Sequence, residues 1–166
     1  LSLLEKHNTK ATFFVLGRVA EKYPDVIKRI ASLGHDIGTH GYDHQLIYWQ
    51  SPQEFENDLR LSLQILEGIT KQKITKYRAP SYSINKSNLW ALEILVRNGI
   101  EIDSSIMPSQ NKRFGIHTAP VEPYCIVFSS GHQLLELPPT TFKIAGKRIP
   151  ASSGFFFRTL PLWLIK

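Results

Sequence analysis

Cysteine, long apolar runs and repeated segments are scarce in this sequence. The single cysteine, Cys125, excludes a disulfide framework and a zinc site built from cysteines. No apolar run approaches the roughly 18 residues that a membrane-spanning helix needs, and no secretory signal pattern is visible. Neither an internal repeat nor a low-complexity segment is found. The chain is therefore predicted to fold as one globular domain.

The charge of the chain does not indicate a nucleic-acid partner. The 166 residues carry a net charge of +6, and 42% of them are hydrophobic, enough for a domain with its own core. The basic residues are scattered except for two short clusters, at 71–76 and 143–148. Neither cluster has an aromatic stacking platform or a recognisable nucleic-acid motif. Solubility or an anionic envelope polymer explains the charge equally well.

Both ends of the sequence resemble the interior of a longer chain. Leu1, Leu3 and Leu4 already form the apolar stripe of a helix. Pro161 suits the first turn of another helix, whose apolar face begins at 162–165 just before the sequence stops. We therefore expect these residues to be part of a longer protein, whose targeting segment could lie outside them.

Predicted strands and helices alternate along the chain. Strands are expected at 11–17, 35–40, 73–80, 100–105 and 133–140, and helices at 18–33, 51–67 and from Asn85 or Ser87 to the residue before Gly99. The second helix has the strongest start signal, because Ser51 and Glu54 form a capping box around Pro52. This alternation with short connections predicts parallel βαβ units and an α/β fold.

Polar side chains follow three consecutive predicted strands where each strand ends. His40 and His44 follow the first of these strands, and Arg78 and Asp103 lie at the ends of the next two. Sites in parallel α/β folds form at the carboxyl ends of the strands. The sequence thus predicts that these side chains gather at one rim.

The segment THGYDH, at 39–44, is a candidate metal clamp. Two neutral imidazoles can bind zinc, but they need a third ligand and an open position for water. Asp36 lies four strand residues, about 13 Å, before His40, too far to share one ion with it. Asp43 could supply a ligand, although a solvated turn aspartate is its commoner role. A pair of unrelated loop histidines remains the alternative.

The segments YRAPSYS, 77–83, and IDSSIMP, 102–108, carry the other candidate side chains. Arg78 could hold a catalytic carboxylate, or it could be a surface arginine. The backbone N–H groups of Ser81 and Tyr82, which follow a proline, are free to point at an oxyanion. Asp103 could pair with Arg78, or it could cap the turn that follows.

Taken in this order, the motifs resemble the polysaccharide deacetylases, the NodB-like domain of carbohydrate esterase family 4. The resemblance covers nearly the whole chain and includes ATFFVLG, GHDIGTHGYDH, YRAPSYSI, IDSSIMP and LLELPPTTFKIAGKRIPASSGFFFRTLP. The last of these segments is similar to the branch linked to exopolysaccharide biosynthesis. The resemblance implies a distorted (β/α) barrel and a substrate polymer that carries N-acetylated sugars.

The resemblance also implies a metal site. The family binds one divalent ion, usually zinc, with one aspartate and two histidines, and the histidines match His40 and His44. Gly41 replaces a frequent serine or threonine between them, which removes a hydrogen bond behind the ligands.

Further roles follow from the same alignment. Arg78 matches the arginine that orients the catalytic base, and Asp103 matches the aspartate that pairs with it. Ser81 falls at the backbone donor of the oxyanion hole, where a tyrosine is frequent. Pro80 and Tyr82 are implied to line the substrate site, although this exchange makes a ring contact to sugar doubtful.

Two of the family's motifs are not found in the sequence. The Asp-Asp pair that supplies the general base and the third ligand would precede Leu1, and the general-acid histidine would follow Lys166. The resemblance thus implies that 1–166 is a partial NodB homology domain, which alone should be inactive. Two rivals remain: a small-amide or cyclic-imide hydrolase of the same fold, and a non-catalytic glycan-binding protein.

Overall fold

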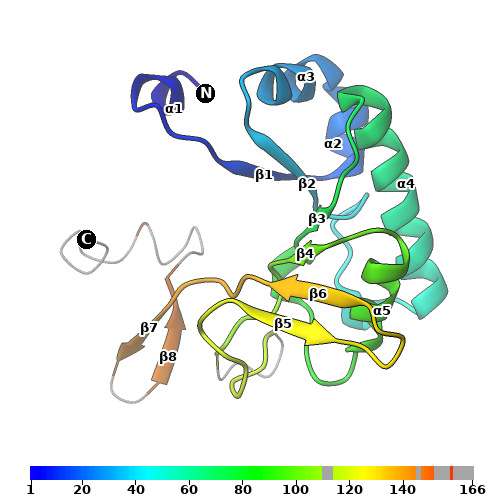
Figure 1. Ribbon diagram of the computed structural model, residues 1–166, viewed down its shortest axis with the longest axis vertical. Coiled ribbons are helices and arrows are strands. Elements are labelled where there is room, and N and C mark those ends of the chain that lie inside the picture. Colours follow the sequence, from blue (N-terminus) through cyan, green and yellow to red (C-terminus); the bar gives the residue numbers. More distant parts are fainter. Residues whose placement is uncertain (110–113, 145–146, 152–157, 159–166) are drawn as a thin grey trace.

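The computed structural model describes residues 1–109, 114–144, 147–151 and 158, and it shows a mixed α/β fold (Figure 1). The helices are α1 (Ser2–Lys6), α2 (Gly17–Lys22), α3 (Pro24–Ser32), α4 (Pro52–Thr70) and α5 (Trp90–Arg97). The strands are β1 (Thr12–Val15), β2 (Asp36–Thr39), β3 (Lys76–Tyr77), β4 (Ile102–Asp103), β5 (Tyr124–Val127), β6 (Gln133–Glu136), β7 (Thr141–Ile144) and β8 (Lys147–Pro150). Two 3₁₀ turns lie at Ile47–Trp49 and Pro80–Tyr82.

The strands form one six-stranded sheet and a separate hairpin. The order in the sheet is β1-β2-β3-β4-β6-β5, and every pair is parallel except β5 with β6. The hairpin pairs β7 with β8. The predicted parallel βαβ architecture is therefore confirmed, and the described strands form an open sheet rather than a closed barrel.

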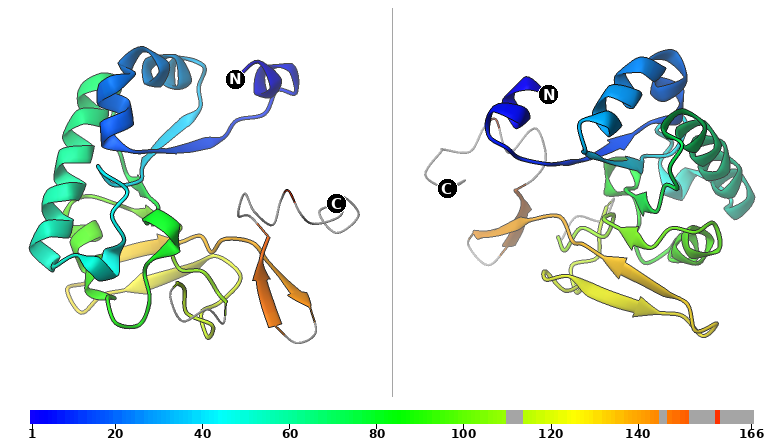
Figure 2. Two further views of the ribbon diagram at one scale, coloured as in Figure 1. Left: turned by 180° about the vertical axis from the view of Figure 1, so that it is seen from behind. Right: turned by 45° about the horizontal axis from the view of Figure 1, so that its top comes forward.

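Helices α2, α3, α4 and α5 cover one face of the sheet, and the other face is open along the described chain (Figures 1 and 2). The longest helix, α4, forms the centre of this layer and contacts α2, α3 and α5. Phe55 on α4 joins the layers, because its ring packs edge-on against Tyr77 of β3 and Trp90 of α5, with centroid separations of 5.9 and 5.8 Å. No helix in the described ranges is both long and apolar enough to span a bilayer.

Helix α4 confirms the capping prediction. The Ser51 side chain accepts a hydrogen bond from the Glu54 N–H, and the Glu54 carboxylate accepts one from the Ser51 N–H. Pro52 occupies the first turn, where its missing N–H costs nothing. The predicted inward residues Phe55, Leu59, Leu63 and Leu66 are all buried, and the helix continues to Thr70.

Two helix predictions need correction. The predicted helix 18–33 is divided into α2 and α3, because Pro24 lacks an N–H and keeps Tyr23 out of the helical region, at φ −132° and ψ 57°. The helix predicted from Asn85 or Ser87 begins only at Trp90. Asn85 instead accepts hydrogen bonds from Ser87, which stabilise a turn before the helix.

The strand predictions held in position but not in extent. Strands β3 and β4 have only two residues each. Strand β5 at the sheet edge and the hairpin strands β7 and β8 were not predicted. The residues of β5 alternate between half-buried and exposed, and Gly131 lies in the turn that follows. The N-terminal apolar stripe lies on α1, which buries none of its residues. The helix expected at 161–165 lies outside the described residues.

We predict that the stability of the fold depends on the buried face of α4. Leu59→Ala should lower the free energy of unfolding by about 2–5 kcal/mol, because it removes a fully buried side chain and leaves a cavity. Leu61→Ala on the same helix should change it by less than about 0.5 kcal/mol, because Leu61 is 42% exposed. Urea unfolding followed by circular dichroism measures both values. Equal losses in the two variants would contradict this packing.

Candidate functional site

The candidate side chains share one edge of the sheet because three parallel strands end in register. Thr39 of β2 pairs with Tyr77 of β3, and Tyr77 pairs with Asp103 of β4. The residues that follow, His40, Arg78 and Ser104, therefore lie side by side at the carboxyl ends of the strands. The predicted rim is confirmed for His40 and Arg78.

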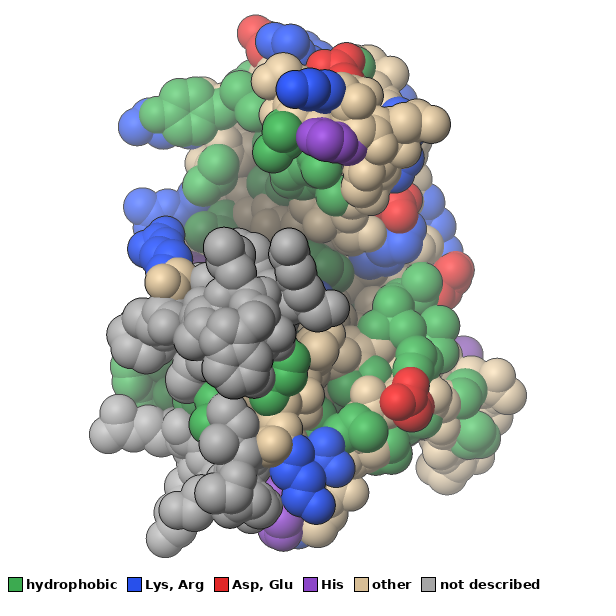
Figure 3. All heavy atoms as spheres, turned by 90° about the vertical axis from the view of Figure 1, so that its left-hand side faces the viewer, with side chains coloured by type: hydrophobic (Ala, Val, Ile, Leu, Met, Phe, Trp, Pro, Cys, Tyr) green, Lys and Arg blue, Asp and Glu red, His purple; other side chains and the backbone are tan. Residues whose placement is uncertain are grey.

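Successive side chains along each strand point alternately to the helix-covered face and to the open face of the sheet. Thr39 and Tyr77 face the helices, since they contact Ser62 and Phe55 of α4. The next residue of each strand projects to the opposite face. There His40 and Arg78 border a cavity of about 390 Å³ with Phe14, Ser81 and Tyr82. Figure 3 looks at the open side of the sheet, where the surface is hollowed below the N-terminal helix.

The two histidines of the candidate metal clamp, His40 and His44, lie next to each other. Their ring centroids are 5.2 Å apart, and the rings meet edge-on. His40 Nδ1 is 2.6 Å from the carbonyl oxygen of Arg78. A carbonyl can only accept, so Nδ1 carries the proton and the lone pair lies on Nε2. Burial is the main reason that the pKa of His40 is lowered, which favours the neutral, metal-binding form.

A hydrogen-bonded ring fixes the backbone between the histidines. The Gly41 N–H donates to Thr39 Oγ1 (3.2 Å), and Ser62 Oγ donates to the Gly41 carbonyl (3.1 Å). Because the Ser62 proton is used there, Thr39 Oγ1 must donate to Ser62 Oγ, 2.7 Å away. These contacts hold the loop without the serine or threonine that is frequent at position 41.

Asp58, on the outer helix α4, also holds this loop, although no sequence pattern indicated its role. Its carboxylate accepts from the backbone N–H groups of Tyr42 (2.8 Å) and Asp43 (3.3 Å). A Cβ atom at Gly41 would lie 2.7 Å from Asp58 Oδ2, and Gly41 has a φ of +76°. Both facts explain the glycine at this position. The role of Asp58 depends on a contact between residues distant in sequence, and no local pattern marks it.

The structure gives Asp43 and Asp36 roles apart from metal binding. Asp43 forms a salt bridge with Arg18, and Asp36 forms one with Lys76 at 2.9 Å. Within the described ranges, no group of three or more His, Cys, Asp and Glu side chains could hold a metal ion. The donor set is thus a histidine pair that fits a metal ion and needs at least one further ligand.

Arg78 has a different partner from the one expected. Its Nη2 donates to Ser104 Oγ at 2.7 Å, and its Nε donates to the Ser104 carbonyl at 3.2 Å. Ser104 Oγ donates in turn to the Leu137 carbonyl at 2.7 Å. The rings of Phe14 and Tyr82 lie 4.3 and 5.7 Å from the guanidinium carbon. The guanidinium is thus held by both hydrogen bonds and aromatic packing.

The expected pairing of Asp103 with Arg78 is wrong in this structure. Asp103 is in register with Tyr77, so its side chain points to the helix face, where it is fully buried. It accepts a hydrogen bond from Ser105 Oγ and lies next to Glu136 of β6 in the ladder. Neither Ser104 nor Glu136 was predicted from the sequence, although Ser104 follows Asp103 at the strand end.

The loop after β3 is strained at the predicted oxyanion position. Ser81 and Tyr82 both adopt left-handed conformations, with φ of 51° and 54°, which are costly for residues other than glycine. The Tyr82 N–H is already bonded to the Ala79 carbonyl at 3.1 Å, so it is not a free donor as predicted. The Ser81 N–H has no acceptor among the described residues. Pro80 is buried in this turn, and its expected contact with substrate stays a prediction.

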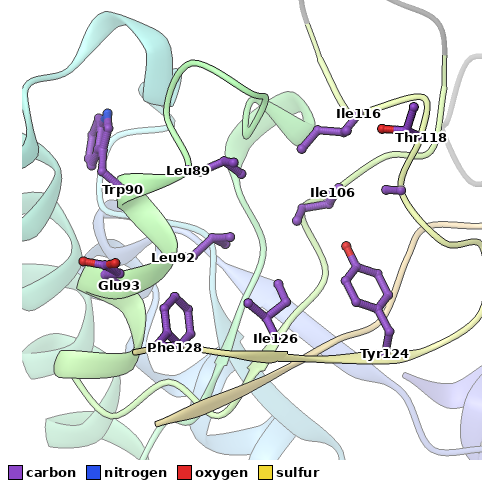
Figure 4. Close-up of a pocket in the computed structure, with 11 residues that line it drawn as sticks. Leu89, Trp90, Leu92, Glu93, Ile106, Ile116, Thr118, Tyr124, Ile126 and Phe128 are labelled. Carbon is purple, nitrogen blue, oxygen red and sulfur yellow. The ribbon is translucent and has the colours of Figure 1, made fainter. Parts of the chain in front are cut away.

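A larger cavity, of about 620 Å³, lies away from this rim (Figure 4). Its aliphatic side chains converge from α5, β5 and the segment that follows β4; Leu92, Ile106 and Ile126 point into it. It lacks a cluster of titratable groups, so the smaller polar cavity beside His40 and Arg78 is the better candidate for chemistry.

Two family models match the sequence. The family model described as polysaccharide deacetylase matches residues 1–100, and a domain of unknown function, DUF3473, matches 104–166. A peptidoglycan-N-acetylglucosamine deacetylase of Bacillus cereus is 39% identical over 94 residues, which are 56% of this chain and 34% of that protein.

Solved structures show the same relationship. A polysaccharide deacetylase from Mycobacterium smegmatis is 28% identical, with a TM-score of 0.70 over 84% of this chain and 43% of that one. A family 4 pseudoenzyme from Bacillus anthracis is 25% identical, with a TM-score of 0.57 over 64% and 37% of the two chains. The chain spans less than half the length of each of these relatives. The family model covers more than half of this chain, which therefore belongs to the polysaccharide deacetylase family.

Proposed function

We propose that this chain carries part of the active site of a metal-dependent deacetylase that hydrolyses N-acetyl groups on an amino-sugar polymer. The observation that carries the proposal is the histidine pair, with Nδ1 of His40 fixed by the Arg78 carbonyl. The relatives whose names specify peptidoglycan N-acetylglucosamine support an amino-sugar substrate.

In this proposal, Nε2 of His40 and the ring of His44 supply two ligands to one divalent ion, of which zinc is the best match to imidazole donors. Such an ion, when bound, polarises the acyl oxygen and lowers the pKa of water. A third ligand would have to come from outside the described residues, because they hold no group of three potential ligands.

The remaining residues of the rim orient the reacting groups. Arg78, fixed by Ser104, offers its remaining N–H donors and its charge to the carboxylate that removes a proton from water. The Ser81 N–H stabilises the negative charge that develops on the acyl oxygen. The proton for the leaving amine would come from a general acid outside the described residues, as the family resemblance implies.

A non-catalytic glycan-binding protein is the second candidate. The related pseudoenzyme from Bacillus anthracis shows that the same fold exists without this activity, and the described residues offer only two metal ligands. Hydrolysis of N-acetylated oligosaccharides by the full-length gene product separates the two candidates.

We predict that zinc binding depends on both histidines. In the full-length gene product, His40→Ala and His44→Ala should each abolish tight zinc binding measured by calorimetry, because each removes a direct ligand. Deacetylation of a chito-oligosaccharide should fall by at least about 100-fold. His117→Ala is the matched control, since His117 is exposed and lies away from the rim. Unchanged zinc affinity in both variants would refute the metal clamp.

We also predict that Ser104 acts through Arg78. Ser104→Ala should lower kcat by about 10- to 100-fold with little change in KM, because the guanidinium loses an acceptor that fixes its orientation. Ser104→Thr, which keeps a hydroxyl, should recover most of the rate, and the exposed Ser32→Ala is the control. Wild-type kinetics for Ser104→Ala would show that the aromatic rings alone orient Arg78.

A further inference from the structure

Two buried carboxyl groups lie side by side on the helix face of the sheet. Asp103 of β4 and Glu136 of β6 are paired in the parallel ladder, and both are fully buried. Each has one oxygen in use: Asp103 Oδ1 accepts from Ser105 Oγ, and Glu136 Oε1 accepts from the Ile106 N–H at 3.0 Å. The other oxygens, Asp103 Oδ2 and Glu136 Oε2, have no donor among the described residues.

Two ionised carboxylates cannot share this position at acceptable cost. Both are acceptors only, both have lost their water, and the described structure shows no salt bridge from a cation to either one. One proton removes one of the two charges and allows a hydrogen bond between the two neighbouring carboxyl groups. Glu136 is the better holder of this proton, since the positive charge of Arg78 favours the ionised form of Asp103 and does not act on Glu136.

The titratable surroundings agree with this assignment. Burial, followed by the neighbouring Asp103, raises the pKa of Glu136 to about 10, and burial raises that of Asp103 less. Tyr77 of β3 and Tyr124 of β5 face the pair, and burial raises the pKa of both, so both are neutral. On α5, Glu93 and Arg97 are exposed and do not neutralise the pair.

The pair is connected to the candidate site by Ser105. The Ser105 hydroxyl donates to Asp103, so its lone pair is free to accept from the Ala79 N–H, 2.8 Å away. Ala79 follows Arg78 and leads into the strained turn at Ser81. On the other side, Glu136 holds Ile106, two residues after the Ser104 that binds Arg78.

We propose that Glu136 is a positioning residue, which shares one proton with Asp103 and through Ser105 and Ile106 fixes the backbone that presents Arg78 and Ser81. This role rests on the proposed deacetylase function, whereas the shared proton does not. Glu136 acts from the opposite face of the sheet and touches neither substrate nor metal.

The shared proton can be observed directly. In the full-length gene product at pH 7, infrared spectroscopy should show the carbonyl stretch of a buried protonated carboxylic acid, which is lost in Glu136→Gln. Carbon NMR of labelled glutamate side chains should show one that stays protonated until the pH rises toward 10. An ionised Glu136 at pH 7 would overturn the proposal, whether or not the protein is a deacetylase.

The positioning role is tested by two variants of Glu136. Glu136→Gln imitates the protonated acid, because its carbonyl accepts from Ile106 and its amide donates to Asp103; kcat should stay within about threefold of wild type. Glu136→Leu leaves Ile106 and Asp103 without partners, so kcat should fall by about 10- to 100-fold with little change in KM. Equal rates for Glu136→Leu and wild type would overturn the role.

Ser105 provides an independent check if Glu136→Leu does not fold. Ser105→Ala breaks the connection between Asp103 and Ala79 but leaves the acid pair, so it should lower kcat while the infrared band persists. Ser105→Thr should restore the rate. Loss of the band together with the rate in Ser105→Ala, or no loss of rate, would show that the pair does not act through Ser105. A wild-type protein that shows the band and no deacetylation would refute the proposed function alone.

Discussion

The register of the parallel strands is the constraint on which the rest of the site depends. Thr39, Tyr77, Asp103 and Glu136 form one row across four strands, and all four face the helix layer. The next row of residues therefore faces the open side, where the candidate chemistry lies. If one strand shifted its register by one residue, its side chains in the two rows would exchange faces. Buried packing on one face thus determines which polar side chains meet on the other.

This alternation also explains what the sequence could and could not predict. The positions of the five predicted strands, the capping box of α4 and the placement of His40 and Arg78 at the rim follow from local patterns, and these predictions were confirmed. The partner of Arg78 depends on register, which no local pattern specifies. The motif suggested Asp103, but register places Ser104 opposite Arg78.

Contacts distant in sequence account for the remaining differences. Asp58 lies on a helix face that looks ordinary in the sequence, and Glu136 lies in an apolar strand, so neither appears functional until the fold brings it to its partner. By contrast, the break at Pro24 was visible in the sequence, because proline disfavours a helical conformation at the residue before it. The resemblance to the family is the basis of the proposed ligand roles of His40 and His44, and the structure indicates the tautomer of His40.

The contact of Asp58 with the histidine loop connects the site to the outer layer of the protein. Asp58 belongs to α4, and it holds the two backbone N–H groups between His40 and His44. Ligation that stiffens the loop would also stiffen the side of α4 that carries Asp58, where Leu59 and Ser62 are buried. Binding of a ligand at the rim would then slow amide hydrogen exchange along α4, which lies on the opposite side of the sheet from the ligand.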